Sequence, residues 1–413
     1  TGSLLSGLYP AFVLSRFKPV VVLKGRVISS RQGAGLRKAL VVFQFAASLF
    51  LLVGTLIVFK QIRFMRGQEL GFTMEQTLVV KAPMAVDDVL YGQKLVTLRQ
   101  NLRNESVLQD LSASSYIPGE PVEFNAAGIR LRGEDFKQGK EYRVITTDDH
   151  FVPAFDLKLA AGRNFSERFG GEAMSVMFNE TGLRKLGFSD PKEAIGKQIN
   201  FWEKFYTIVG VVKDYHQQGL RESMEPLIFR YDPAVKGAIS MKIAAADAQQ
   251  AIATVRKHYT ALFPDNPFDF FFLDQYFDNQ YQADQRFGQV FGLFTGLAIF
   301  VACLGLFGLA SFTVMQRTKE IGVRKVLGAS VPQILGLLYR EYATLIVWAF
   351  AMGAPLAWWF SARWLQGYAF RTGVGWLSFV LPLLIVLAVA FLTVGVQSFR
   401  AATANPVKSL RSE

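Results

Sequence analysis

The sequence predicts an α-helical membrane protein with four transmembrane helices and an inserted α/β (α+β) extracytoplasmic domain of two subdomains. Of its 413 residues 51% are hydrophobic, and the mean hydropathy is +0.24. The apolar residues gather into four long runs, and one block of more than 200 mixed residues separates the first run from the second. A helix of about 20 apolar residues crosses the roughly 30 Å of bilayer hydrocarbon, so each run is long enough to span a membrane.

The four runs define the expected order of segments. Residues 1–25 are expected to end a preceding repeat, and residues 26–38, 316–332 and 398–413 to lie in the cytoplasm. The block 67–285 is expected to form the extracytoplasmic domain with its stalk. Transmembrane helices are expected at 39–60, 286–315, 333–361 and 376–397.

The distribution of charge opposes a nucleic-acid-binding interpretation of the net charge of +12. Residues 67–286 hold 25 Lys and Arg against 30 Asp and Glu, whereas the rest of the chain holds 20 against 3. The basic residues therefore flank the apolar runs, where Lys and Arg keep a segment in the cytoplasm. This pattern predicts cytoplasmic termini, an outward central domain, contact with membrane lipid and no nucleic-acid partner.

An internal similarity links the two ends of the chain. Residues 5–25 resemble residues 392–412, because in both an apolar segment runs into a basic segment that contains Pro-Val, at Pro19 and at Pro406. Such self-similarity predicts a repeated unit, so that a complete protein would have about eight spans and two outer domains. A chance match remains the alternative.

The central block alternates β-like and helix-like segments and ends in a long polar helix. Gln275–Arg286 contains no Gly or Pro, which favours a continuous helical stalk over a flexible linker. The one cysteine, Cys303, falls in the second apolar run, so the domain must fold without a disulfide. Helices are expected near residue 87 and at 247–262, and strands at 77–82, 128–131, 142–146, 175–178, 205–213, 227–231, 239–243 and 268–273.

No catalytic or metal site is predicted. His150, His216 and His258 lack ligand spacing, and Asp148-Asp149-His150 is more typical of a helix start. The phosphate-loop pattern Gly-x4-Gly-Lys-[Ser/Thr] is absent from the sequence. We therefore expect a chain that is not an enzyme and binds no cofactor itself.

Small residues recur within the apolar runs. Gly288, Gly292 and Gly296 recur at every fourth position, which predicts close approach of another helix, although glycine is also common in membrane helices generally. Gly353, Ala357 and Ser361 give the third run a similar face. Charged residues are absent near the middle of all four runs, which disfavours an ion-coupled carrier.

The segment between the second and third runs predicts a short amphipathic helix. Glu320 and Arg324 stand four residues apart, and Val323, Val326 and Leu327 form a narrow apolar stripe. Gly328 is placed to end the helix, and Ser330-Val-Pro-Gln333 fits a capping box. An alternative is that the basic residues merely anchor a loop to lipid head groups.

This segment, Arg317–Ser330, resembles the signature turn of the FtsX-like permeases, and the outer block resembles the MacB-type periplasmic core domain. Further resemblance lies in Phe178-Asn-Glu-Thr181, Ile208–Asp214 and Tyr276-Phe-Asp278. The resemblance implies that the turn docks on a P-loop ABC ATPase subunit, which would bring ATP and Mg. Coupling residues would be Arg317, Lys319, Glu320, Gly322, Arg324, Lys325, Gly328 and Ser330.

The resemblance implies a permease subunit in the bacterial plasma (inner) membrane. It would couple ATP hydrolysis to motion of the outer domain for export or extraction of a drug, peptide or lipoprotein. The alternative is a signal-transmitting scaffold that regulates an extracytoplasmic enzyme such as a cell-wall hydrolase. Expected partners also include a periplasmic adaptor and a second permease unit, in the same longer chain or as a dimer. The resemblance also implies a first unit ahead of this one, without which the chain is not expected to work alone.

Overall fold

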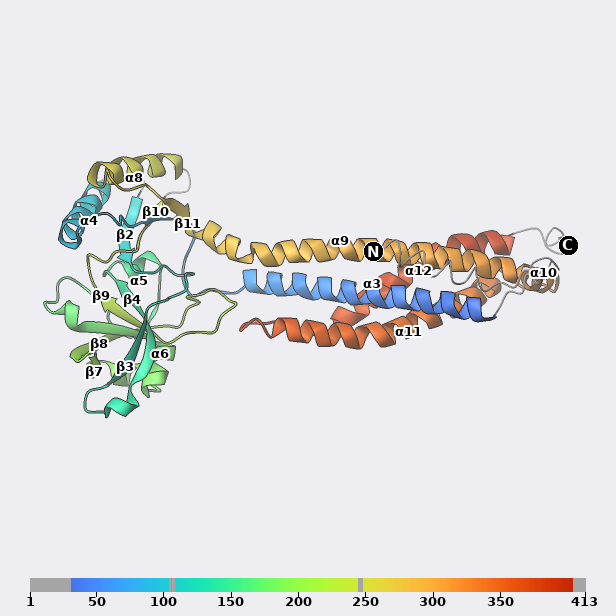
Figure 1. Cartoon of the computed structure of the whole chain (residues 1–413), viewed down its shortest axis with the longest axis horizontal. Coiled ribbons are helices and arrows are strands. Elements are labelled where there is room, and N and C mark those ends of the chain that lie inside the picture. The colour runs from blue at the N-terminus through green and yellow to red at the C-terminus, as the bar shows by residue number, and fades with distance from the viewer. Residues whose placement is uncertain (1–30, 104, 106–107, 244–247, 404–413) are drawn as a thin grey trace, which may run out of the picture. The chain divides into compact units, whose positions relative to one another are not determined.

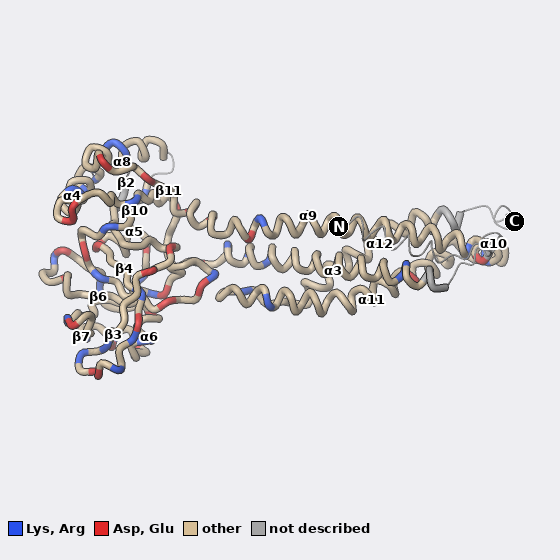
Figure 2. The backbone as a smooth tube through the Cα atoms, viewed as in Figure 1, with Lys and Arg blue, Asp and Glu red and all other residues tan. Residues whose placement is uncertain are grey.

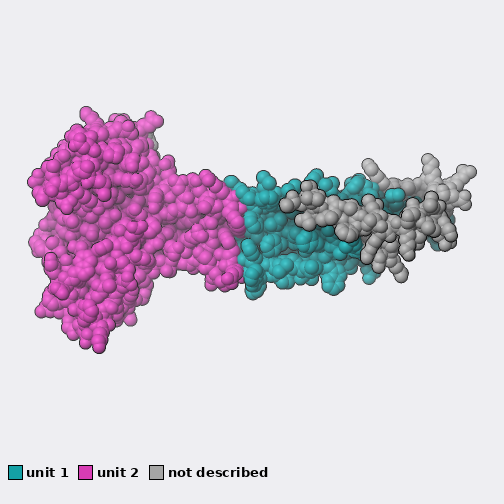
Figure 3. All heavy atoms as spheres, viewed as in Figure 1, with its two compact units in different colours: residues 1–57, 289–361, 374–413 teal, residues 58–288, 362–373 magenta. Residues whose placement is uncertain are grey.

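The computed structural model describes residues 31–103, 105, 108–243 and 248–403. These residues form two compact units (Figure 3). We call them the helical unit, with the described residues up to Ile57, Gln289–Ser361 and those from Val374 onward, and the α/β unit, with Val58–Gly288 and Ala362–Gly373. The proposed repeat at residues 1–25 lies outside the described residues.

Four long helices account for the four apolar runs. They are α3 (Arg31–Arg66), α9 (Leu273–Gln316), α11 (Val331–Leu365) and α12 (Leu377–Thr403). Each is long and apolar enough to cross a membrane, so the described residues contain the four predicted spans. Few charged residues lie along these helices, whereas Lys, Arg, Asp and Glu are frequent in the α/β unit (Figure 2).

The stalk prediction is also confirmed, because α9 is one continuous helix of 44 residues. It begins in the α/β unit and continues into the helical unit. Within the helical unit, α3, α9, α11 and α12 share one apolar core. Its buried residues are Val41, Phe45, Leu49, Ala302, Leu306, Leu309, Ala310, Leu338, Tyr342, Ile346, Ala349, Val386, Ala390 and Val394.

Eleven strands of the α/β unit form one mixed sheet. Its order is β11-β1-β10-β2-β4-β3-β7-β8-β6-β9, with β5 paired to β8, and β9 also pairs with β4. The strands are β1 (Thr77–Lys81), β2 (Leu108–Ser114), β3 (Asn125–Leu131), β4 (Lys140–Thr147), β5 (Leu159–Gly162), β6 (Ser175–Asn179), β7 (Gln198–Phe201), β8 (Lys204–Val212), β9 (Leu227–Tyr231), β10 (Ala238–Ile243) and β11 (Phe270–Phe272).

Two parts of this sheet correspond to the two predicted subdomains. Strands β11, β1, β10 and β2 are covered by α4 (Asp88–Arg103) and α8 (Ala248–Leu262), which lie side by side (Figure 1). The additional β4–β9 pairing closes β4, β3, β7, β8, β6 and β9 into a ring, whose alternate side chains form a second core. A single residue pair, Ser114 with Thr147, joins β2 to β4.

Short helices complete the α/β unit: α5 (Phe151–Ala154), α6 (Glu180–Leu186) and α7 (Pro191–Ala194). The helix predicted to start at Asp148–His150 begins at Phe151, with His150 as N-cap residue and no side-chain capping bond. A third core lies against α5. It combines residues from the end of α3, such as Ile62, from the start of α9, such as Phe277, and Tyr368 from the loop after α11.

Candidate functional site

The predicted turn helix is α10 (Thr318–Val326), which belongs to the helical unit. Arg317 occupies its N-cap position, directly after α9. Arg324 Nη2 lies 2.8 Å from Glu320 Oε1, so the predicted pair four residues apart is formed. Both side chains are nearly half exposed, at 45% and 43%, so they remain available to a partner.

Gly328 ends this helix in the manner that the sequence predicts. Its φ is +90°, which an L-residue rarely adopts, and the space around its Cα is open. The Ala329 N–H donates to Arg324 O at 2.9 Å and the Gly328 N–H to Lys325 O at 3.1 Å, which together make a Schellman motif. The requirement for glycine here is therefore conformational.

The start of α11 is capped by only part of the predicted capping box. The Ser330 N–H donates to Gln333 Oε1 at 3.0 Å, as in such a box. The Gln333 N–H, however, donates to the Ser330 carbonyl at 3.1 Å. The end of α10 at Gly328 is thus followed within a few residues by the capped start of α11. This limits the conformational freedom of the turn.

Two faces of α10 have different surroundings. Ile321 is buried against Ile334 of α11 and fixes the helix to its neighbour. Val323, Val326 and Leu327, the predicted apolar stripe, are 48%, 65% and 80% exposed. Exposed large apolar side chains beside charged ones are typical of a protein or membrane contact surface. Gly322 is buried and Lys325 half-buried, while the Lys319 side chain lies outside the described part.

A carboxylate of α11 connects this turn to α3. Glu341 Oε1 lies 2.5 Å from Lys38 Nζ, and Glu341 Oε2 lies 2.9 Å from Arg317 Nη2. We refer to these three residues as the Glu341 cluster. Glu341 was not among the residues predicted from the sequence, although an acid in an apolar run is a signal that points to function or pairing.

The predicted glycine face on α9 is close to a neighbour only at one end. A Cβ on Gly288 would lie 3.2 Å from Val58 Cγ1, whereas one on Gly292 would lie at an ordinary 3.9 Å from Thr55 Cγ2. Gly296 faces open space. A close approach to backbone occurs at Gly353 of α11, where a Cβ would lie 2.8 Å from the carbonyl oxygen of Ala46 in α3.

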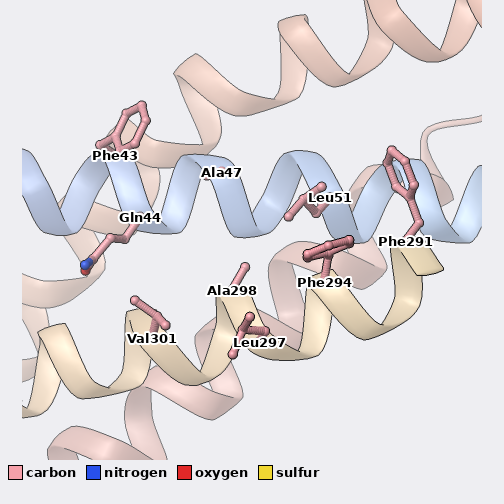
Figure 4. Close-up of a pocket in the computed structure, with 9 residues that line it drawn as sticks. All are labelled: Phe43, Gln44, Ala47, Leu51, Phe291, Phe294, Leu297, Ala298 and Val301. Carbon is pink, nitrogen blue, oxygen red and sulfur yellow. The ribbon is translucent and has the colours of Figure 1, made fainter. Parts of the chain in front are cut away.

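An apolar groove of about 440 Å³ lies between α3 and α9 in the helical unit (Figure 4). Gln44 is its polar lining residue, and Gln44 Oε1 accepts no hydrogen bond from the described residues. The groove can accept an apolar helix or chain. It is lined by Phe43, Gln44, Ala47, Leu51, Phe291, Phe294, Leu297, Ala298 and Val301.

The loop between α11 and α12 is held by a second cluster, in the α/β unit. Gln61 of α3 is fully buried; its Nε2 donates to Phe370 O and its Oε1 accepts from the Thr372 N–H, both at 2.8 Å. The Tyr368 hydroxyl donates to Asp284 Oδ1 of α9 at 2.9 Å. Burial, and then the bond to Asp284, raise the pKa of Tyr368, so its hydroxyl remains a donor. We refer to Gln61, Asp284, Tyr368 and Phe370 as the Gln61 cluster.

The three histidines lie in separate environments. His150 Nδ1 is 2.9 Å from Asp149 Oδ1, and His258 Nε2 is 3.4 Å from Glu105 Oε1. His216 packs edge-on against Phe370, with ring centroids 4.5 Å apart. Burial lowers the pKa of His216, and its Nδ1 has no hydrogen-bond partner in the described part of the chain.

Known proteins match parts of this chain in sequence. Residues 292–406 match the family described as FtsX-like permease C-terminal. The chain is 25% identical over 259 residues to the macrolide export ATP-binding/permease protein MacB of Aggregatibacter actinomycetemcomitans, covering 59% of this chain and 39% of the relative. It is 27% identical over 261 residues to the pyoverdine export ATP-binding/permease protein PvdT of Pseudomonas syringae pv. tomato, covering 57% and 38%. The chain therefore spans well under half the length of these relatives.

Solved structures resemble part of the chain. The periplasmic region of MacB from Actinobacillus actinomycetemcomitans aligns with a TM-score of 0.35 and 14% identity, over 53% of this chain and 94% of that one. The extracellular domain of the noncanonic ABC-type transporter YknZ from Gram-positive bacteria aligns with a TM-score of 0.33 and 11% identity, over 47% and 97%.

Proposed function

We propose that this chain, which belongs to the FtsX-like permease family, is the permease component of an ABC export system whose energy comes from a separate ATPase subunit. The observation that carries this proposal is α10, a short helix with exposed apolar and charged side chains and a fixed end on each side. The names of the relatives pair a permease with an ATP-binding part, which supports an ATPase partner that would bind ATP and Mg.

In this proposal α10 is the surface through which ATP-driven motion enters. The ATPase would contact Val323, Val326 and Leu327 together with Glu320 and Arg324, all of them exposed. Displacement of α10 would reach α9 at Arg317 and α11 through the Ile321 contact. Because α9 is unbroken from Gln316 to Leu273, it can carry that displacement toward the α/β unit.

The proposed location is the bacterial inner membrane, with α10 and both termini in the cytoplasm and the α/β unit outside. The basic residues near α10 and at the start of α3 support this orientation. A second permease unit would cover the apolar groove of α3 and α9, and a periplasmic adaptor would meet the α/β unit. The proposed cargo is a drug, peptide or lipoprotein, exported or extracted outside the membrane.

The test exchanges two charges without removing their pair. Glu320→Arg combined with Arg324→Glu keeps a pair four residues apart but inverts the charges that α10 presents. In the full-length permease we expect this variant to insert normally and to recover less ATPase by co-purification. Gly328→Val, which forces a β-branched residue to φ +90°, should have the same effect.

A charge change in an exposed pair of the α/β unit provides the control. Asp156→Asn removes the ion pair with Lys158 at 2.7 Å and should leave ATPase recovery unchanged. Normal ATPase recovery and activity in both α10 variants would contradict the proposal and favour lipid anchoring by the basic residues. Stimulation of the ATPase by a small molecule would support transport, whereas stimulation only by a protein partner would support signalling.

A further inference from the structure

We propose that Glu341 is a positioning residue that makes the first turns of α3 move together with the turn helix α10. This inference rests on the proposed function, since it describes how motion that enters at α10 reaches a second helix. Glu341 is the single acidic residue of α11. It receives one cation from α3 and one from the junction of α9 and α10.

The contacts of Glu341 divide between its two carboxylate oxygens. Oε1 accepts a hydrogen bond from Lys38 Nζ at 2.5 Å, and Oε2 lies 2.9 Å from Arg317 Nη2 as an ionic contact. The Glu341 side chain is only 19% exposed, whereas Lys38 and Arg317 are 41% and 33% exposed. One largely buried carboxylate thus joins two cations from separate chain segments.

Arg317 connects the Glu341 contact to both α9 and α10. Arg317 is the N-cap residue of α10, its N–H donates to Thr313 O of α9, and its carbonyl accepts from the Ile321 N–H of α10. Any displacement of α10 must therefore displace Arg317. Because Glu341 holds both Arg317 and Lys38, the displacement is transmitted to α3 as well as to α9.

A second contact supports the same connection. The Arg37 guanidinium lies over the Phe312 ring of α9, with its carbon 3.9 Å from the ring centre. Adjacent residues of α3 are therefore held from two sides, Arg37 by α9 and Lys38 by α11. The cation–π contact joins α3 to α9 alone, whereas the carboxylate joins α3 to α11 and to Arg317.

The positioning role requires the negative charge of Glu341 and not only the shape of its side chain. Glu341→Gln keeps the size of the side chain but leaves Lys38 and Arg317 as two cations without the carboxylate between them. Like charges repel, and the repulsion is screened less at partly buried sites than in water. Glu341→Asp keeps the charge with one methylene fewer and is the matched conservative variant.

The test measures a distance in the full-length permease together with the ATPase that co-purifies with it. Spin labels are placed at Leu40 of α3 and Met315 of α9, which are 58% and 77% exposed, after Cys303→Ala removes the free thiol. In the unchanged protein we expect the same narrow distance without nucleotide and after trapping with ADP and vanadate. Glu341→Gln should broaden that distance without nucleotide and shift it on trapping, while Glu341→Asp keeps it narrow.

ATPase recovery separates this inference from the proposed function. Glu341→Gln should recover as much ATPase as the unchanged protein, because α10 and its exposed side chains are intact. Unchanged distances in Glu341→Gln, or equal broadening in the Gln and Asp variants, would overturn the positioning role of the charge. Failure of the unchanged protein to recover an ATPase would contradict the proposed function instead, and the nucleotide-free distances would still decide the role of Glu341.

Discussion

The Glu341 cluster and the Gln61 cluster connect α3, α9 and the α11 region with different chemistry. In the helical unit, Glu341 joins side chains that are all charged and partly exposed. In the α/β unit, Gln61 is fully buried and binds backbone groups of the loop after α11, and one carboxylate, Asp284, accepts from a neutral hydroxyl. Ion pairs tolerate small changes of geometry better than paired hydrogen bonds to a backbone do. The first cluster is thus suited to transmit movement and the second to fix a loop in place.

The close packing of α11 against the α3 backbone in the helical unit is expected to give the largest effect. Gly353→Leu would place a side chain where even a Cβ lies 2.8 Å from Ala46 O, so α3 and α11 must separate. Overpacking of this kind costs about 1–3 kcal/mol or more. We expect a clear loss of detergent-resistant folded permease, measured by thermal unfolding. Gly296→Leu, at a position in open space, is the matched control and should unfold as the unchanged protein does.

Removal of the Gln61 amide is expected to have the next largest effect. Gln61→Leu keeps a side chain of similar size but leaves Phe370 O and the Thr372 N–H without their partner. Unpaired polar groups that are largely buried cost about 1–3 kcal/mol each. Hydrogen exchange should then accelerate in residues 366–373. Lys60→Gln, which removes an exposed bond of 3.1 Å to Gly373 O, should change exchange much less; equal effects would contradict the importance of burial here.

Acid should weaken the loop next to the Gln61 cluster through His216. Burial lowers the pKa of His216, so the folded protein takes up this proton less readily than the unfolded chain does. The His216 contribution is therefore retained above the unfolded pKa of about 6.5 and is lost as the pH falls through it. The protection of residues 366–373, taken relative to the intrinsic exchange rate at each pH, should be lower at about pH 5.5 than at about pH 7.5, on either side of the ordinary histidine pKa. His216→Phe, which keeps a ring against Phe370, should remove this difference; if it persists, another group titrates.

High salt is expected to have the smallest effect of these changes. It should weaken the Glu341 cluster slightly and leave the Gln61 cluster unchanged. The Debye length falls from about 8 Å at physiological ionic strength to about 3 Å in 1 M salt, which weakens the half-exposed Lys38 and Arg317 contacts by less than about 1 kcal/mol. High salt should broaden the distance between labels at Leu40 and Met315. Exchange around Gln61, whose bonds are neutral, should stay constant. Equal responses of both regions would show that the ionic contacts are not the relevant difference.

The sequence predicted the elements whose signals are local. Long apolar runs marked the four helices, and hydrophobic strands such as β6, β9 and β10 were found close to their true ends. Strand β2 was missed because its sequence, LQDLSAS, is half polar. Its Ser112 hydroxyl donates to Asp148 Oδ1 at 2.8 Å, so a polar face is satisfied by a partner distant in sequence. Such a strand has no recognisable pattern before its partner is known.

The candidate functional site was predictable only in part, because some of its contacts join residues that are distant in the sequence. The ends of α10 follow from Glu320, Arg324 and Gly328, whose contacts lie within a few residues. Glu341 and Gln61 act on residues about 300 positions away, at separations of 303 and 309. Gly288, Gly292 and Gly296 of α9 formed a regular pattern, yet Gly296 faces open space, whereas Gly353 of α11 lies close to the α3 backbone. Periodicity identifies a face of a helix, but it does not identify the neighbour.

The most direct test of the account is nucleotide-dependent hydrogen exchange in the complete permease with saturating ATPase. In the unchanged protein, trapping with ADP and vanadate should alter exchange in α10, along α9 and in the α/β unit. With Glu320→Arg and Arg324→Glu combined, the change in α9 and in the α/β unit should be lost. Equal changes in both proteins, or a change confined to α10 in the unchanged protein, would contradict the claim that α10 couples ATP hydrolysis to the outer domain.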